Sequence, residues 1–376
     1  MISFNNSYQK YAKKFAYKET RDNHDNFKKK YSYHIIIPIY NELDYIHSTL
    51  QSIEKQKTDL LNETLIILII NNNQNASSEI KDKNYKTHQL ILKNKYNFEY
   101  VVLDYYSNKN AIKEKDFGVG LARKIGFDFA LKYSDQNSLF FSLDADTLVS
   151  PLYLETIVQH YKKFYFSACV INFRHQQAKD TNIENGIRIY EKALHEMAIK
   201  IKQCNSPYGY ISMGSTIICT AQEYLLVGGM PKKKACEDFY FMQSLAKHTQ
   251  IYFIKKVLVY PSSRVEQRVH LGTGYRMNEY KKHNTFKNLF FPDSSYQIVQ
   301  CIIAIAEKNY GNAYTTVNKE LIKNLSDKVC NFLDKNNICK VWQQINLNAK
   351  SKQQFMLFFH QWFDALKIMQ LLKYVS

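Results

Sequence analysis

The strongest constraint on the fold is an alternation of apolar runs and amphipathic segments across residues 34–143. Four largely apolar runs are typical of buried strands: "HIIIPIY" at 34–40, "LIILII" at 65–70, "FEYVVLDY" at 98–105 and "SLFFSL" at 138–143. We expect Pro38 to end the first strand, because proline has no N–H to donate. Between the strands, 42–56 (capped by Asn41) and 118–133 have the apolar spacing of helices. This order predicts an α/β fold with a mostly parallel sheet and helices on both faces.

The remainder of the chain divides into further segments. We predict a helix from the cap Ser150-Pro151 to about 163, a strand over 166–174, a helix over 182–202 and a mainly helical region beyond 281. The predicted domains are an N-terminal extension (1–33), two halves of the α/β body (34–150 and 151–280) and a helical C-terminal region (281–376). In the last region we expect one stripe to be packed core, with a membrane-facing surface as the alternative: Phe355, Phe359, Trp362, Leu366 and Met369.

Composition excludes several classes of protein. No apolar run approaches the ~20 residues that a membrane-spanning helix needs. Seven cysteines without a Cys-x-x-Cys pair argue against a zinc cluster and a disulfide scaffold, so we expect a reducing, cytoplasmic location. The net charge of +17 favours an anionic partner: a nucleotide, a nucleic acid or an acidic membrane surface. The chain is rich in lysine throughout, which weakens that signal.

An acidic pair follows the fourth predicted strand. Asp144 and Asp146 lie in "FFSLDADTLVSP", separated by one alanine. Ligands of open α/β sheets bind beyond the carboxyl ends of the strands, which is where this pair falls. Aspartates also favour turns and helix caps, so the pair alone is compatible with a plain turn or with a divalent-metal site.

Five motifs in order distinguish these interpretations. "IIIPIYNE", "LIILIINNN", "GVGLARKIGFDFA", "FFSLDADTLVSP" and "CEDFYF" have the order and spacing seen in family 2 glycosyltransferases, which the chain resembles over roughly residues 34–275. The resemblance implies the GT-A fold, a Rossmann-like sheet that binds a nucleotide, with 34–150 as the nucleotide-sugar-binding half and 151–280 as the acceptor-binding half. It also implies transfer of a sugar from a nucleoside-diphosphate donor to an acceptor hydroxyl, with inversion at the anomeric carbon.

The resemblance assigns roles to the acidic residues. Asp146 would be the main ligand of Mn²⁺ or Mg²⁺ with Asp144 as its partner, and the ion would stabilise the departing diphosphate. In "CEDFYF", Asp238 would be the general base that deprotonates the acceptor, and Glu237 would orient that acceptor. Carboxylates are also favoured at any helix start by the helix dipole.

Further residues are assigned to the donor by the same resemblance. Pro38, Tyr40 and Glu42 would line the base and ribose, Arg123 would lie near the nucleotide, and Gly214 and Ser215 would leave room for the sugar. Asn71 begins an Asn-Asn-Asn run where many relatives have an aspartate for the base, so a UDP- or a GDP-sugar stays open. Gly126 inside a helix is expected to pack closely on the sheet or ligand.

A loop rich in arginine and glycine completes the predicted site. "SSRVEQRVHLGTGYR" carries Arg264, Arg268 and Arg276, which suit closure over a diphosphate. His270 in this loop is a metal ligand or a structural histidine.

These observations favour a metal-dependent glycosyltransferase of surface glycan or glycoconjugate synthesis. Its acceptor would be a glycan, a lipid-linked molecule or a protein, with peripheral contact to the inner face of a membrane left open and no specific nucleic acid. A sugar-nucleotide pyrophosphorylase would need a glycine-rich basic loop after the first strand, which "PIYNELDYI" does not provide. The alternative is a degenerate GT-A fold or a basic binding protein that does not turn over a donor.

Overall fold

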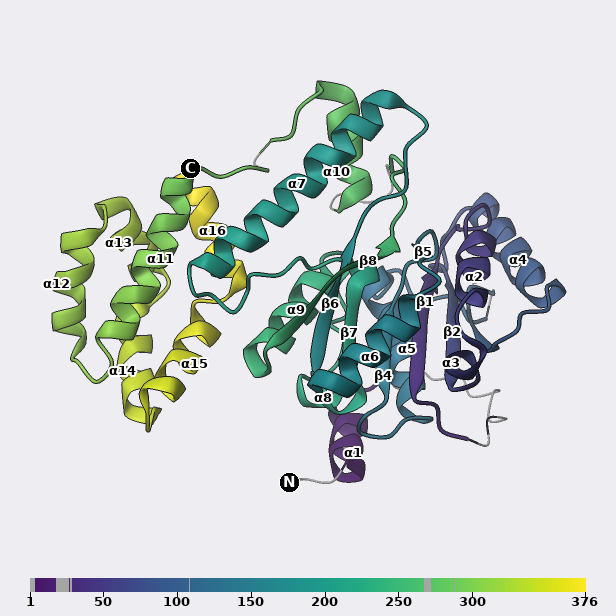
Figure 1. Ribbon diagram of the computed structural model, residues 1–376, viewed down its shortest axis with the longest axis horizontal. Helices are drawn as coiled ribbons and strands as arrows, with labels where there is room; N and C mark the ends of the chain where they lie inside the picture. Colours follow the sequence, from purple (N-terminus) through teal and green to yellow (C-terminus); the bar gives the residue numbers. More distant parts are fainter. Residues whose placement is uncertain (1–3, 18–26, 28, 108, 267–271, 288) are drawn as a thin grey trace. The chain divides into compact units, whose positions relative to one another are not determined.

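The computed structural model describes residues 4–17, 27, 29–107, 109–266, 272–287 and 289–376. Within these residues one sheet has the strand order β3-β2-β1-β4-β7-β6-β8-β5 (Figure 1). Its strands are β1 (Tyr33–Ile39), β2 (Thr64–Asn71), β3 (Glu99–Tyr105), β4 (Leu139–Ser142), β5 (Leu148–Val149), β6 (Ala168–Phe173), β7 (Ile217–Thr220) and β8 (Ile251–Tyr260).

The sheet is parallel where the sequence predicts it and mixed beyond. β1 pairs in parallel with both β2 and β4, and β2 with β3. β7 runs antiparallel between β4 and β6, while β6 and β8 are parallel. The predicted α/β class with a mostly parallel sheet is therefore confirmed.

Helices surround the sheet and form the C-terminal region. The helices that follow or connect the strands are α1 (Phe4–Lys14), α2 (Ile46–Glu54), α3 (Thr58–Asn62), α4 (Ser78–Lys93), α5 (Val119–Leu131), α6 (Tyr153–Phe164), α7 (Thr181–Gln203), α8 (Ala221–Leu226), α9 (Glu237–His248) and α10 (Thr273–His283). The C-terminal helices are α11 (Asp293–Lys308), α12 (Tyr314–Asn324), α13 (Asp327–Lys335), α14 (Ile338–Asn348), α15 (Lys352–Trp362) and α16 (Ala365–Val375). The helical C-terminal region is confirmed.

Strand β1 continues through Pro38 to Ile39, so the expectation that proline ends it is wrong. The carbonyl of Ile36 accepts from the Leu143 N–H on the β4 side, and β4 pairs with β1 no further than Ile36. The backbone N–H and C=O groups of successive residues in a strand point to alternate neighbouring strands. The nitrogen of Pro38, two residues after Ile36, therefore points to the β4 side, where β4 has already ended. The missing N–H therefore costs no ladder bond.

Two predicted helix starts are also wrong. α2 begins at Ile46, and Asn41 is not its cap but has a left-handed backbone, with φ 60°. α6 begins at Tyr153, and the Ser150 hydroxyl accepts only from the Leu152 N–H. Both starts lie just after strand ends, where the chain turns to present side chains to the site before it becomes helical. Helix α4 has few apolar residues and was not predicted.

By its contacts the described chain forms two compact units. The first contains residues 1–187 and 212–282, and the second contains 188–211 and 283–376. Division of the first unit into donor and acceptor halves stays a prediction. In the second unit Phe355 and Phe359 are fully buried, which confirms that this part of the aromatic stripe is core. No helix among the described residues is long and apolar enough to cross a membrane.

Candidate active site

The site lies where β1 and β4 end side by side. Ile36 and Ser142 are paired in register, and the Leu143 N–H donates to the Ile36 carbonyl at 3.0 Å. Glu42 follows β1, while Asp144 and Asp146 follow β4. The parallel pairing of two apolar strands therefore brings the three carboxylates to one edge of the sheet.

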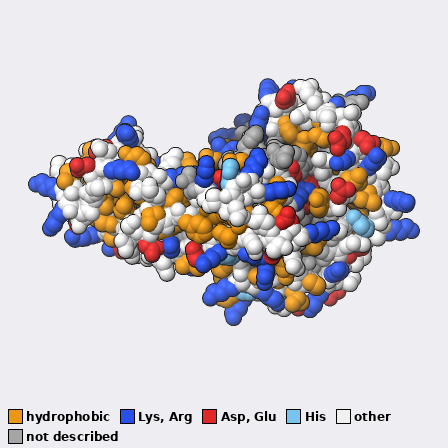
Figure 2. All heavy atoms as spheres, turned by 90° about the horizontal axis from the view of Figure 1, so that it is seen from above, with side chains coloured by type: hydrophobic (Ala, Val, Ile, Leu, Met, Phe, Trp, Pro, Cys, Tyr) orange, Lys and Arg blue, Asp and Glu red, His pale blue; other side chains and the backbone are white. Residues whose placement is uncertain are grey.

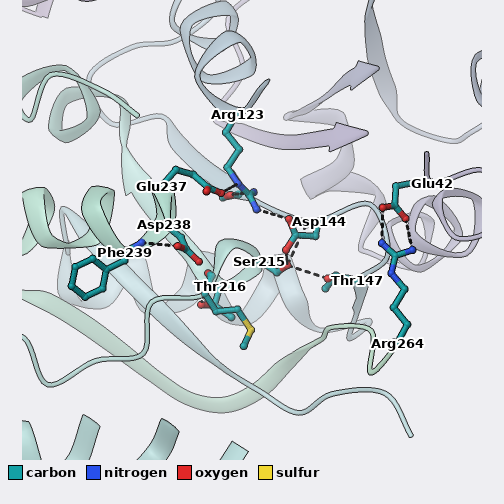
Figure 3. Close-up of polar contacts among 12 residues, drawn as sticks. Glu42, Arg123, Asp144, Thr147, Ser215, Thr216, Glu237, Asp238, Phe239 and Arg264 are labelled. Carbon is teal, nitrogen blue, oxygen red and sulfur yellow. Dashed lines mark hydrogen bonds and ion pairs between the residues drawn. The ribbon is translucent and has the colours of Figure 1, made fainter. Parts of the chain in front are cut away.

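Arg123 of α5 links the two acidic motifs (Figure 3). Its Nε donates to Glu237 Oε1 at 3.0 Å, its Nη1 to Ser142 Oγ at 2.5 Å, and its Nη2 to Asp144 Oδ1. The side chain is 3% exposed, and its carboxylate neighbours keep its pKa above the ordinary value against the effect of burial. A guanidinium places its donors on three nitrogens held in a rigid plane, so it can reach partners on different sides, whereas a lysine offers donors on a single nitrogen.

The segment before β7 packs against Arg123 and Asp144. Ser215 donates its hydroxyl proton to Asp144 Oδ2 and lies 3.0 Å from the hydroxyl of Thr147. A Cβ at Gly214 would lie 2.2 Å from Arg123 Nη2, so a side chain at this position would displace the guanidinium. Gly214 and Ser215 are thus beside Asp144, where the sequence predicts the donor sugar.

Glu237 and Asp238 begin α9. Cys236 before them has a left-handed backbone (φ 59°), and Asp238 Oδ1 accepts from the Phe239 N–H at 2.7 Å. Burial, reinforced by the charge of Glu237, raises the pKa of Asp238 to about 7. Burial also raises the pKa of Glu237, although Arg123 opposes the shift. A carboxylate with a pKa near neutrality is suited to accept and release a proton.

Arg264 covers the opposite side of the acidic cluster. Its two Nη atoms donate to both oxygens of Glu42 at 2.8 and 2.6 Å, and its Nε lies 3.1 Å from Asp146 Oδ2. The guanidinium also lies 4.4 Å from the ring centre of Tyr45. Burial raises the pKa of Asp146 to about 7, with Arg264 lowering it and the charges of Glu42 and Asp144 raising it further.

The described site carries more negative than positive charge. Its carboxylates are Glu42, Asp144, Asp146, Glu237 and Asp238, and the guanidinium groups paired with them are Arg123 and Arg264. Because like charges at short range repel, the described carboxylates disfavour an anionic diphosphate that binds without an accompanying cation. Among the described residues, no group of three or more His, Cys, Asp or Glu side chains is arranged to hold a metal ion.

Other predicted residues have different surroundings. The Nδ2 of Asn71 donates to the Ile39 and Ile69 carbonyls, so this amide ties β1 to β2. The ring of Tyr40 lies 5.1 Å from that of Phe117, and Pro38 is part of β1. Arg268 and His270 lie outside the described residues. Arg276 pairs with Glu279 of its own helix at 2.8 Å.

Sequence reasoning missed two polar residues of the site. Ser142, which is fully buried, accepts from Arg123, and the backbone carbonyl of Asp146 accepts from Gln176 Nε2 at 2.9 Å. Ser142 could have been found, because it is the one polar residue in the buried run "LFFSL". Gln176 has no comparable local signal.

Residues 34–218, just under half of the chain, match the model of glycosyl transferase family 2, so this segment belongs to that family. Together with the α/β fold, the match identifies a glycosyltransferase of the GT-A class. A search of curated proteins found no match.

Solved structures with a similar fold include TarS 1–349 of S. aureus. It has 14% sequence identity and a TM-score of 0.43, with 87% of this chain and 90% of that chain covered. The same protein in complex with UDP-GlcNAc gives 12% identity and a TM-score of 0.44 over the same shares. The mannosyltransferase PcManGT from Pyrobaculum calidifontis, in complex with GDP-Man and Mn²⁺, gives 11% identity and 0.42, covering 90% of this chain and 89% of that one.

Proposed function

We propose that this glycosyltransferase moves a sugar from a UDP- or GDP-sugar to an acceptor hydroxyl with inversion, using Asp238 as general base. The observation that carries the proposal is the link through Arg123. One buried guanidinium bonds Asp144 of the donor-side motif and Glu237, the neighbour of Asp238. The acidic residue beside the predicted donor site and the start of the base-bearing helix are therefore held in one network.

The reaction follows from these positions. Asp238 accepts the proton of the acceptor hydroxyl as that oxygen attacks the anomeric carbon. The new carbon–oxygen bond forms while the bond from the anomeric carbon to the diphosphate oxygen breaks, and the electron pair leaves with the nucleoside diphosphate. Attack from the face opposite the leaving group inverts the configuration.

Arg123 acts here as a positioning residue. The family resemblance predicts that it lies near the nucleotide, and in the structure its nitrogens bond Glu237, Ser142 and Asp144. We infer that it sets the distance between the donor and the base, and that Glu237 holds α9 through Arg123. Gly214 packs against Arg123 and Ser215 bonds Asp144, and in this proposal both residues line the sugar end of the donor site.

The residues fit a divalent ion in charge and in ligand type. Asp144 and Asp146 offer hard carboxylate oxygens, and the excess of negative charge among the described site residues favours a cation beside a bound diphosphate. When bound, Mn²⁺ or Mg²⁺ would act as a Lewis acid on the leaving diphosphate. In this proposal Asp146 would be the principal ligand and Asp144 the second.

The donor base, the acceptor and the cellular location are proposed as classes. A uracil or guanine base would lie near Tyr40, Glu42 and Asn71. The acceptor would be a glycan, a lipid-linked sugar or a protein in surface glycan or glycoconjugate synthesis, in the cytoplasm. On the face drawn in Figure 2, Lys and Arg side chains are dispersed and form no continuous stripe, which does not favour a nucleic-acid partner.

The test combines donor binding with turnover. A panel of UDP- and GDP-sugars with Mn²⁺ is screened by thermal shift, and nucleoside-diphosphate release is then measured for the donor that binds. Asp238→Asn is expected to keep donor binding and to lower turnover by ~10²–10⁴-fold. Asp146→Ala is expected to abolish Mn²⁺-dependent donor binding. Asp82→Asn, which alters an exposed surface pair, is the matched control.

Two outcomes would contradict the proposal. Undiminished turnover in Asp238→Asn would remove Asp238 as the base. Donor binding without any turnover in the unmodified protein would favour the alternative of a GT-A fold that only binds.

A further inference from the structure

We propose that the edge of the sheet opposite the active site binds the surface of an anionic lipid bilayer. β1, β4, β6 and β8 all begin at this edge, since Tyr33 pairs with Leu139 and Ala168 with Ile251. β7 ends there, pairing Thr220 with Leu139. We call this surface the basal edge and define it by the last turn of α6 with Tyr165, by α8 and by α1 with Phe15.

Contacts make the basal edge continuous. The Thr220 N–H, just before α8, donates to the Ser167 carbonyl at 2.9 Å, so the turn after α6 adjoins the start of α8. α1 packs on α8, with Tyr11 and Tyr224 ring centres 5.6 Å apart and their hydroxyls 3.2 Å apart. In Figure 1, α1, α8 and the end of α6 lie together below the sheet.

Large apolar side chains project from this edge. Phe164 is 47% exposed, Tyr165 78% and Phe15 50%, and Leu226 of α8 is also exposed. Phe and Leu make no hydrogen bonds with water or with a polar ligand. Amphipathic surfaces that lie in a bilayer interface combine such side chains with lysines.

Tyr165 gives independent support for an external role. It ends α6 in a left-handed conformation, with φ 47° and ψ 41°, where glycine is the favoured residue. Its ring meets Tyr161 at a centroid distance of 6.3 Å but is mostly exposed. The fold therefore gains little from this strained tyrosine, whereas a contact outside the chain would use it.

The charge of the basal edge matches an anionic surface. Lys162 and Lys163 close α6, and Lys10, Lys13 and Lys14 are exposed on α1. Residues 1–17 contain no aspartate or glutamate. The adjoining loop has the exposed Asp135, which accepts from the Asn137 N–H of its own loop. Each lysine close to an anionic leaflet strengthens binding of the protein to the membrane, and a flat bilayer presents headgroups to all of these lysines at the same time.

The bilayer is favoured over a nucleic acid by residue type. The named cations of the basal edge are all lysines. Residues 4–17 and 153–166 contain no arginine, the residue whose planar guanidinium binds phosphate oxygens in pairs. Exposed Phe and Leu favour a site with acyl chains beneath the phosphates. Binding by this edge would leave the carboxyl ends of β1 and β4 facing solution, where a soluble donor is available.

The test measures co-flotation of the full chain with phosphatidylcholine vesicles that contain or lack phosphatidylglycerol. We expect binding only to the anionic vesicles. Lys162→Gln with Lys163→Gln should weaken the partition coefficient by roughly 10- to 30-fold. The matched control removes two exposed lysines of α12, Lys319→Gln with Lys323→Gln, and should change binding by less than about threefold.

Tyr165→Gly separates a contact role from a folding role. Glycine fits the left-handed backbone, so the melting temperature should stay the same or rise while vesicle binding falls several-fold. Failure of the unmodified chain to bind anionic vesicles, or equal binding by the α6 variants, would overturn the proposal. So would stronger binding to a DNA duplex at physiological salt. Asp238→Asn should bind vesicles normally, so this result is independent of the proposed chemistry.

Discussion

Asp238 illustrates how burial adjusts a single residue to its proposed task. Its pKa is raised to about 7 by burial and by Glu237. Only the deprotonated carboxylate can accept a proton, so kcat/KM should rise with pH through about 7 and level off above it. The profile is measured with a saturating metal ion and a fixed donor concentration. A rate that is unchanged between about pH 5 and 8 would contradict the role of Asp238 as base.

Arg123 allows a second prediction at the residue scale. It is buried between Asp144, Glu237 and Ser142, so Arg123→Met should leave two carboxylates without their cation. We expect a loss of about 3–5 kcal/mol in the free energy of unfolding. Denaturant unfolding measures it. The control Arg276→Met breaks a partly exposed pair within one helix and should cost less than about 1 kcal/mol. Equal losses in the two variants would refute the central position of Arg123.

At the scale of elements, α5 joins the sheet to α9 through two glycines. A Cβ at Gly126 would lie 2.5 Å from Ile36 Cγ2, which confirms the predicted close packing on the sheet. A Cβ at Gly120 would instead lie 2.5 Å from the Lys233 carbonyl and 2.6 Å from the Pro231 carbonyl, in the backbone that leads to Glu237. α5 therefore holds the base-bearing segment by backbone contact.

Because the two glycines contact different parts of the protein, the same substitution should affect stability at Gly126 and turnover at Gly120. Gly126→Ala should lower stability by about 1–3 kcal/mol through overpacking, while turnover per folded molecule changes little. Gly120→Ala should shift the start of α9 and lower turnover by at least about tenfold, because small misplacements of a catalytic group are costly. Unfolding curves and nucleoside-diphosphate release separate the two effects. Similar turnover in both variants would be the contrary result.

At the scale of the whole molecule, each of the two compact units has its own core. Both tryptophans, Trp342 and Trp362, belong to the second unit, whereas the proposed donor site lies wholly in the first. A nucleotide that binds only the folded first unit raises the stability of that unit. We therefore expect UDP or GDP with Mn²⁺ to raise one calorimetric transition while leaving the tryptophan fluorescence melt in place. A fluorescence melt that moves by the same amount would show that the units unfold together.

The sequence was most informative where a pattern repeats locally. The apolar runs predicted the strands because a buried parallel strand must be apolar on both faces. The motifs placed Asp144 and Asp146 at a strand end and Glu237 at a helix start. Pro38 was misjudged because proline is tolerated inside a strand only where the neighbouring strand needs no N–H from it. The shorter reach of β4, not the residues themselves, makes Pro38 acceptable inside β1.

By itself, then, the sequence determined the α/β class, the family and the acidic residues of the candidate site, since each depends on residue type and on spacing along one stretch of chain. Only the tertiary structure decided what Arg123 bonds, that Arg264 bridges Glu42 and Asp146, and that Phe164, Tyr165 and the lysines of α1 share one edge. Several of these relations join residues more than 100 positions apart, such as Arg123 and Glu237. Such pairings are set by the order and register of strands, which local periodicity does not encode.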